Sequence, residues 1–435
     1  MSSSAAPRTP SIDLLPLRYG AMQAAFSALA LPLYVFLPAY YAREASMPLA
    51  TIGVLLFVPR LFDAFTDPLI GRLADQALHA RRGFALIAVA CVPMLLGFLF
   101  LLGLPSLLRD GSHPLAFNVL AIVALLLTYA GFSAATITHQ AWGAALRADE
   151  AASAELFAWR EALGLLGVLL AAVAGQFAGA RGPALMLTLS LAAALILLRP
   201  LARHPGVPPA TAHAVGWRAM REPLRQVAFR RLLTIQTVSA VASSVPATLV
   251  LFFIRDRIGA PTLAGLFLVV YFGCAAVGAP LWGRMVRKFG AARAWFAGMV
   301  ATVVVFAFAA TLRVGDVRGY ACVCAGSGLM LGADLVLPPT LLAGLIRRLG
   351  HSGSLEGAYF ALWNMAAKLA LALAAGLALP MLAWLGYTPG TPSTGTLPPL
   401  VIAYCLLPAA MKIVAAAMLR GFSMEKTSRL ASRSE

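Results

Sequence analysis

The chain has 435 residues, of which 60% are hydrophobic and only 12% are charged. Globular domains are about 45 to 50% apolar, so this composition argues against soluble domains and indicates a membrane protein. The net charge of +17 might suggest nucleic-acid binding. With a cytoplasmic N-terminus, however, most of the Lys and Arg fall on the cytoplasmic side. This positive-inside asymmetry explains the basic charge as membrane topology and argues against a nucleic-acid surface.

Twelve apolar stretches are each long enough to cross about 30 Å of hydrocarbon as a helix. We predict membrane-spanning helices over residues 19–41, 50–75, 84–104, 115–145, 156–179, 183–203, 229–254, 262–287, 291–312, 318–346, 356–386 and 398–420. The distribution of basic residues places both termini on the cytoplasmic side. We therefore expect an integral membrane protein, located in the inner (plasma) membrane of a bacterium.

A hydrophilic segment rich in Pro, Gly and charge, residues 204–228, divides six predicted helices from six. The stretch PLIGRLADQ, which begins at Pro68, is repeated in similar form as PLWGRMVRK, which begins at Pro280. Each follows the second helix of its half. We predict an all-α membrane protein with an N-terminal half over 1–203 and a C-terminal half over 229–435. Such repeats place a binding site between the halves near the midplane of the membrane.

The stretch RLFDAFTDPLIGRLAD, residues 60–75, places two aspartates four residues apart in the second predicted helix. Asp63, Asp67 and Arg60 share one helix face. A charge at bilayer depth costs about 2.5 to 3.5 kcal/mol on insertion scales, so the carboxylates need positive partners. Arg60 would neutralise one, and a proton or Na⁺ the other, with the Thr66 hydroxyl as an additional oxygen ligand. A static salt-bridge cluster is the alternative.

The repeat shows that this helix pair folds without an acidic couple, because the same offset from Asp63 and Asp67 lands on Ala275 and Ala279. A further positive partner is Lys368, a lone lysine deep in the predicted helix 356–386. Facing lipid would leave its ammonium unpaired. We therefore expect Lys368 to face a cavity and to pair with Asp63 or Asp67 across the interface between the halves.

The 60–75 stretch resembles the second-helix signature of the glycoside-pentoside-hexuronide:cation symporters, a family of the major facilitator superfamily. The similarity extends over nearly all predicted spans, through Tyr19-Gly20, FAWREALGLLG (157–167), GADLVLPPTLLA (332–343) and EGAYFALWNMAAKLALALAAG (356–376). It implies the major facilitator fold of twelve transmembrane helices. It also implies that Asp63 and Asp67 bind a coupling Na⁺, Li⁺ or H⁺, and that Lys368 contacts this cation site.

The resemblance further implies a set of solute-binding positions. Arg160 matches a fifth-helix arginine that helps to bind sugar, and its planar fork suits hydroxyl groups; anchoring of the helix at the cytoplasmic interface is the alternative. Tyr34, Trp363 and Asn364 also fall at pocket positions of the family. For these three residues, ordinary helix packing is the alternative.

The chain departs from the family at three positions. Ser27 stands where the family has a first-helix aspartate that holds galactoside hydroxyls, and the fourth-helix aspartate falls near Ala135. Carboxylates give strong, directional hydrogen bonds, so we do not expect a galactoside. Thr66 replaces an asparagine between the two cation-binding aspartates, which leaves both Na⁺ and H⁺ open as the coupling ion.

Two further polar residues lie within predicted spans. His139 could relay a proton or could be a hydrogen-bonded packing residue. Asp334, in the tenth predicted helix, is isolated among apolar residues. We expect it at a functional, solute-binding position in the cavity, with pairing to a terminal arginine as the alternative.

The resemblance implies a secondary active transporter that moves a sugar or related small polar solute together with H⁺ or Na⁺. A cation-coupled lipid or lysophospholipid transporter of the same fold remains the alternative, because some relatives carry such cargo. No Gly-x-Ser-x-Gly or His-Glu-x-x-His pattern is present, so we do not expect an enzyme. The expected partners are a small-molecule solute and membrane lipids, without a cofactor beyond the coupling cation, and the expected state is a monomer.

Overall fold

The computed structural model describes residues 14–33, 37, 40–41, 49–107, 114–178, 181–203, 221–387 and 398–422. Within these ranges the regular structure is helical throughout and contains no strand. This agrees with the apolar composition, because a helix satisfies its backbone hydrogen bonds internally and can therefore cross hydrocarbon. The predicted all-α class is confirmed.

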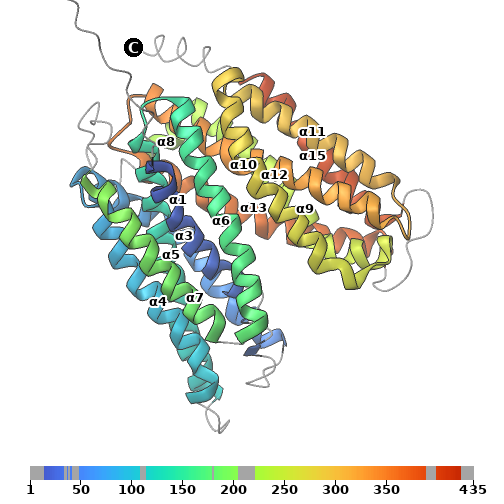
Figure 1. Cartoon of the computed structure of the whole chain (residues 1–435), viewed down its shortest axis with the longest axis horizontal. Helices are drawn as coiled ribbons and strands as arrows, with labels where there is room; N and C mark the ends of the chain where they lie inside the picture. The colour runs from blue at the N-terminus through green and yellow to red at the C-terminus, as the bar shows by residue number, and fades with distance from the viewer. Residues whose placement is uncertain are drawn as a thin grey trace, which may run out of the picture.

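The first half of the chain forms one bundle of six long helices, drawn in blue to green in Figure 1. They are α1 (Leu15–Leu31), α3 (Leu49–His79), α4 (Gly83–Leu107), α5 (Pro114–Leu146), α6 (Glu150–Ala178) and α7 (Arg181–Leu198), followed by a 3₁₀ segment, Arg199–Arg203. Large buried rings such as Tyr19, Phe26 and Phe98 form part of its core.

The second half forms a second bundle. Its helices are α8 (Glu222–Arg225), α9 (Val227–Phe252), α10 (Ala264–Phe289), α11 (Ala291–Thr311), α12 (Val317–Arg348), α13 (Glu356–Trp384), α14 (Pro399–Val401) and α15 (Leu407–Arg420). A π-helical turn, Phe253–Ile258, extends α9, and another, Ile402–Leu406, precedes α15. Most of the predicted linker lies outside the described residues, so the exact boundary between the halves stays a prediction.

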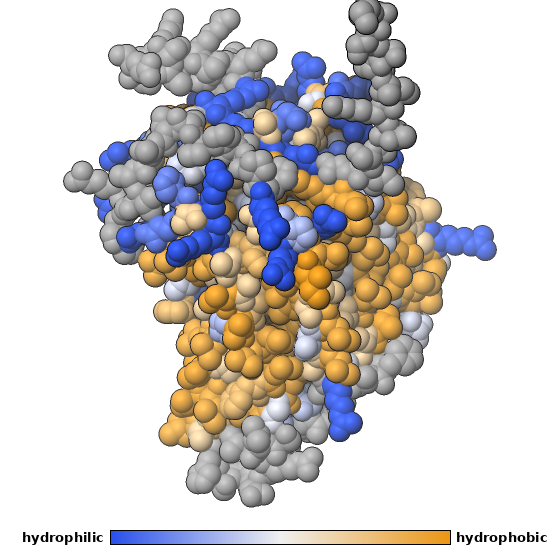
Figure 2. All heavy atoms as spheres, turned by 60° about the vertical axis from the view of Figure 1, so that its left-hand side comes forward, coloured by the Kyte–Doolittle hydropathy of each residue, from blue (hydrophilic) through white to orange (hydrophobic). Residues whose placement is uncertain are grey.

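Within the described ranges, every predicted span overlaps one long helix, and ten of these helices are long and apolar enough to cross a membrane. The other two are α1, with 17 residues, and α3, which carries the charged stretch 60–75. Figure 2 shows a broad hydrophobic surface with hydrophilic residues gathered at one end. We call this the basic end; it includes Arg81, Arg82, Arg147, Arg230, Arg231, Arg293, Arg347, Arg348 and Arg420.

The two bundles meet along two seams: α3 and α5 pack against α13, and α6 packs against α10 and α12. At the basic end, hydrogen bonds cross these seams from Gly357 N to Asp75 Oδ1 (2.5 Å), Ala358 N to Asp75 Oδ2 (2.9 Å), Ala291 N to Glu150 Oε1 (2.6 Å) and Arg347 to Ser153 Oγ (3.1 Å). The bundles are thus joined at this end, and in Figure 1 they diverge away from it.

A candidate cation site between the two bundles

The charged residues of the second predicted helix lie at the seam of α3, α5 and α13. Lys368 Nζ, on α13, donates hydrogen bonds to Asp63 Oδ2 at 2.6 Å and to Asp67 Oδ1 at 2.8 Å. The pairing expected from the sequence is therefore present. It joins the two bundles, because both aspartates belong to the first bundle and Lys368 to the second.

Ser133, on α5, completes this arrangement. Its hydroxyl donates to Asp63 Oδ1 at 2.6 Å and accepts from Lys368 Nζ at 2.8 Å. Ser133 was not among the residues predicted for this site, because only a carboxylate was expected in this part of the fourth predicted helix. A serine among small residues gives no signal of its own, and only the position of α5 beside α3 shows that it belongs to the site.

The charges of the described groups do not balance. Asp63 is 4% exposed and Asp67 is 0% exposed, and the single ammonium of Lys368 bonds both. Among the described residues, Asp67 Oδ2 is buried and has no hydrogen-bond partner. Leaving a buried carboxylate oxygen unpaired is costly. A proton on this carboxylate, or a monovalent cation held by its oxygens, would remove that cost.

The residues present fit such a cation. Carboxylate and hydroxyl oxygens are the donors that hard cations prefer, and they come here from Asp63, Asp67 and Ser133. Pro68, next to Asp67, lacks an N–H group, so the carbonyl oxygen of Ala64 does not receive the usual helical hydrogen bond from residue 68.

Two predicted members of the site are placed less completely. The Thr66 hydroxyl donates to the backbone carbonyl of Asp63 at 3.0 Å, so its proton is engaged within α3 and only its oxygen lone pairs face other groups. The side chain of Arg60 lies outside the described part of the structure. Their roles as cation ligand and charge partner therefore stay predictions.

Arg160 lies buried in α6, with 4% of its surface exposed. Its Nε donates to Gln23 Oε1 of α1 at 3.1 Å, and its guanidinium lies 2.9 Å from Glu161 Oε1. This burial disfavours the alternative that Arg160 anchors the helix at the membrane surface. Gln23 and Glu161 were not singled out from the sequence, although Glu161 directly follows Arg160.

The other predicted solute contacts differ in their surroundings. Asn364 donates to Gln140 Oε1 of α5 at 2.6 Å, which gives a second polar link between the bundles. Trp363 is 6% exposed within a hydrophobic cluster, as the packing alternative predicts. Ser27 is half-buried on α1. Tyr34 lies outside the described residues.

His139 is held as a packing residue. Its Nε2 lies 3.0 Å from the backbone oxygen of Tyr19, and the Tyr19 hydroxyl donates to the backbone oxygen of His139 at 2.8 Å. The two rings stack with their centroids 4.0 Å apart. These reciprocal contacts favour hydrogen-bonded packing over a proton relay.

Asp334 belongs to a second ion pair, of which the lysine is buried and the aspartate lines a cavity. Lys412 Nζ, on α15, donates to Asp334 Oδ2 at 2.5 Å, and Trp295 Nε1 donates to Asp334 Oδ1 at 3.0 Å. Ser243 donates to Oδ2 at 3.1 Å, and Lys412 is completely buried. The partner of Asp334 is therefore Lys412, and not a terminal arginine. All four residues belong to the second bundle.

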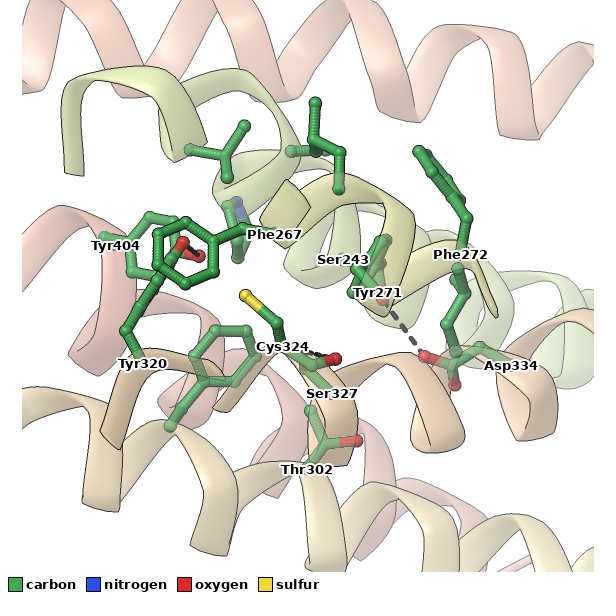
Figure 3. Close-up of a pocket in the computed structure, with 16 residues that line it drawn as sticks. Ser243, Phe267, Tyr271, Phe272, Thr302, Tyr320, Cys324, Ser327, Asp334 and Tyr404 are labelled. Carbon is green, nitrogen blue, oxygen red and sulfur yellow. Dashed lines mark hydrogen bonds between the residues drawn. The ribbon is translucent and has the colours of Figure 1, made fainter. Parts of the chain in front are cut away.

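A cavity of about 140 Å³ lies beside Asp334, between α9, α10, α11 and α12. Figure 3 shows Asp334 at one end of this cavity and Tyr320 with Tyr404 at the other. Its lining is mostly apolar and aromatic and includes Phe267, Tyr271, Phe272 and Phe306. Asp334 thus lines a cavity, as predicted, although its oxygens already accept hydrogen bonds from the protein.

Three solved structures of transporters have this fold. The chain superposes on a bacterial homologue of the iron transporter ferroportin in an outward-facing state (TM-score 0.71, 15% identity, 94% of this chain and 98% of that chain). It is also similar to the major facilitator transporter FucP in the outward conformation (TM-score 0.68, 14% identity, 95% and 99%). A third is the proton:xylose symporter XylE bound to 6-bromo-6-deoxy-D-glucose (TM-score 0.63, 16% identity, 94% and 95%).

At these identities the similarity establishes the major facilitator fold and not the cargo. No curated protein matches the chain by sequence. The model of one family, described as MFS/sugar transport protein, matches residues 18–426, which is nearly the whole chain. The protein is therefore an integral membrane transporter that belongs to the MFS/sugar transport protein family.

Proposed function

We propose that the protein is a secondary active transporter that couples the movement of one monovalent cation, H⁺ or Na⁺, to that of a sugar or related small polar solute. The observation that carries this proposal is the buried cluster of Asp63, Asp67, Ser133 and Lys368. It joins two bundles that must move relative to each other in alternating access, and it leaves Asp67 Oδ2 without a partner among the described residues.

Coupling follows because the cation and Lys368 compete for the carboxylate oxygens of Asp63 and Asp67. Lys368 bonds one oxygen of each aspartate, so a cation that binds both carboxylates weakens the hold of Lys368 on α3. The ammonium then becomes available to a solute hydroxyl, and the ion pair between the bundles loosens. By linkage, the solute must raise the affinity for the cation by the same factor.

The solute is expected to contact the groups that face this seam. Asn364, one helical turn before Lys368, pairs with Gln140, and Arg160 of α6 pairs with Gln23, so both pairs offer hydrogen-bond donors and acceptors. The proton:xylose symporter XylE and the fucose:proton symporter FucP of E. coli show that this fold serves such solutes elsewhere. They support proton coupling and a sugar cargo here.

We further propose that the basic end is cytoplasmic and that the protein resides in a bacterial inner membrane with both termini inside. The positive-inside rule supports this orientation. With the bundles joined at the basic end, the protein is then closed toward the cytoplasm, as expected for an outward-facing state.

A lipid or lysophospholipid cargo is the second candidate. The cavity beside Asp334 favours it, because its mostly apolar, aromatic lining suits an acyl chain better than a free sugar. Ser27 and Ala135 stand where the resemblance would place sugar-binding carboxylates, and this replacement also favours a lipid cargo.

The test is uptake into proteoliposomes containing the full chain. A panel of sugars, polar solutes and lysophospholipids is first assayed for binding to the purified protein with and without Na⁺ over a range of pH. The ligand found is then used for uptake by the parent and by Asp63→Asn/Asp67→Asn, with Glu155→Gln, an exposed carboxylate outside the site, as the matched control.

We expect the double variant to lose accumulation against a gradient while it still exchanges solute across the membrane at equal concentrations. The Glu155→Gln variant should accumulate solute like the parent. Undiminished uphill uptake by the double variant would exclude the proposed coupling site. Binding of lysophospholipids but not of sugars would replace the sugar cargo with the lipid cargo.

A further inference from the structure

The internal repeat places a similar motif at both seams of the basic end, but the charge differs at its last two positions, where Asp75 and Gln76 correspond to Arg287 and Lys288. Gly71, in α3, corresponds to Gly283, in α10. The position of Asp75 in the first copy is taken by Arg287 in the second. Since both helices face the opposite bundle at this end, the two seams can be compared directly.

The α3–α13 seam is closed by direct contact. A Cβ atom added to Gly71 would lie 2.5 Å from the carbonyl oxygen of Gly357, so the two helix backbones touch. Asp75 then accepts hydrogen bonds from the backbone N–H groups of Gly357 and Ala358 at the N-terminus of α13. No space is left for another molecule at this seam.

The α6–α10 seam is different. Gly283 packs closely on Ala158 of α6, but Arg287 makes no backbone hydrogen bond like those of Asp75 with any residue that the structure describes, and its ion partner is Glu155. A crevice of about 130 Å³ remains between the helices, lined by Glu155, Ala158, Trp159, Pro280, Gly283, Arg284 and Arg287. The seam at the second copy of the motif thus contains a crevice, whereas the seam at the first copy is closed by direct contact between the helices.

This crevice carries an excess of positive charge. Arg284 is exposed and has no hydrogen bond or ion pair with any residue that the structure describes. Arg287 lies 3.9 Å from Glu155, and both side chains are more than half exposed, at 59% and 51%. Exposed pairs of this kind contribute little. Glu155 therefore offsets only one of the two guanidinium charges, and an anion is the complementary ligand.

An apolar surface continues from the crevice into the hydrocarbon. On α6, Trp159, Leu166 and Leu170 recur at helical spacing and are 38%, 46% and 61% exposed. On α10, Leu281 and Val277 precede Arg284 by three and seven residues and are 47% and 62% exposed. The site is therefore charged at the basic end and apolar along the seam, and Trp is typical of the membrane interface between these regions.

We propose that the crevice between α6 and α10 binds the headgroup of an anionic phospholipid, with Arg284 and Arg287 contacting its phosphate and the acyl chains lying along the apolar surface of the seam. The lipid bridges the two bundles beside the hydrogen bonds from Ala291 N to Glu150 and from Arg347 to Ser153, where the second copy of the motif has Arg287 in place of Asp75. It therefore favours the arrangement that is joined at the basic end. This site is independent of the coupling ion and the solute.

The first test measures lipid binding to the full chain. Delipidated protein in detergent is titrated with phosphatidylglycerol, phosphatidylcholine or inorganic phosphate, and bound lipid is counted by native mass spectrometry. At about 1 kcal/mol for each basic residue, Arg284→Gln/Arg287→Gln should bind phosphatidylglycerol about 10- to 30-fold more weakly. The matched control is Arg230→Gln/Arg231→Gln, which removes two exposed charges at the same end on α9, away from the crevice.

The second test locates the lipid. Phosphatidylglycerol brominated near the carbonyl end of its chains should quench Trp159, one of seven tryptophans. The quenching is assigned as the part that disappears in Trp159→Phe, and the double arginine variant should lose this part as well.

Equal loss of binding in the Arg230/Arg231 control, or equal affinity for phosphatidylcholine, would overturn the proposal. So would competition by inorganic phosphate at matched ionic strength, or an unchanged Trp159 signal. Circular dichroism and elution as a single species establish that the variants are folded before the comparison.

Discussion

Asp75 and Gly357 are bonded across the seam of the two bundles, with the backbone N–H of Gly357 donating to Asp75 Oδ1 at 2.5 Å. Gly357 lies in the first turn of α13, where N–H groups lack helical partners and the helix dipole is positive. The same helix carries Lys368, which pairs with Asp63 and Asp67. The closure of the basic end and the candidate cation site therefore depend on the position of one helix.

Replacing Asp75 with alanine should loosen this closure. Loss of a capping side chain costs about 0.5 to 2 kcal/mol, and 1 to 2 kcal/mol is roughly a 5- to 30-fold change in an equilibrium. We expect Asp75→Ala to populate arrangements that are open at the basic end. Distances between spin labels at exposed positions of α4 and α11 near that end would measure the shift. Unchanged distances would show that the cap contributes nothing to closure.

Gly71→Ala should act in the same direction through packing. The added methyl group would lie 2.5 Å from both Ala361 Cβ and the carbonyl oxygen of Gly357, so α3 and α13 would have to separate. Gly273→Ala, in α10, is the matched control, because its methyl group would meet nothing within 4 Å. We expect opening at the basic end and a lower melting temperature for Gly71→Ala only. A similar effect of both substitutions would mean that helix propensity, and not contact, determines the outcome.

The ion pair between the bundles could be predicted from the sequence because a lone charge at bilayer depth is costly. That cost required partners for Asp63, Asp67 and Lys368, and few charged residues were available in the spans. The same reasoning placed Asp334 at a cavity. It did not identify Lys412 as the partner of Asp334, because the relative position of the two helices that carry them depends on packing.

The remaining contacts depend on how the helices pack, which the sequence does not specify. Ser133 belongs to the cation site only because α5 lies beside α3, and Trp363 is a packing residue because its position on α13 points into a hydrophobic cluster. The repeat predicted two similar seams. The crevice at the α6–α10 seam could not be predicted in this way, because it depends on which residues of the opposite bundle face the second copy of the motif.

Removing the ammonium of Lys368 should lower the stability of the protein, because Asp63 and Asp67 lose their shared positive partner. Lys368→Met leaves two buried carboxylates without their shared partner, and breaking a buried ion pair costs about 3 to 5 kcal/mol. We expect a lower melting temperature that added Na⁺ or acid partly restores, together with loss of uphill uptake. The measurement is thermal unfolding of the purified protein over a series of Na⁺ concentrations and pH values.

A second substitution separates charge from packing at this site. Lys368→Met/Asp63→Asn removes one carboxylate together with the ammonium, so the double variant should recover most of the lost stability without recovering coupled uptake. If the double variant is as unstable as Lys368→Met, the lysine supports the fold through packing and not through charge.

The ion pair of Lys412 and Asp334 should behave differently, because both residues lie within the second bundle and move together. Lys412→Met leaves a mostly buried carboxylate whose remaining described donors, Trp295, Ser243 and Ser239, are neutral. We expect a loss of about 3 to 5 kcal/mol of stability, which Lys412→Met/Asp334→Asn should largely restore. Neither variant should respond to Na⁺ more strongly than the parent, because no cation site is disturbed. Thermal unfolding with and without Na⁺ tests this, and Na⁺-dependent stabilisation specific to Lys412→Met would instead place a second cation site in the second bundle.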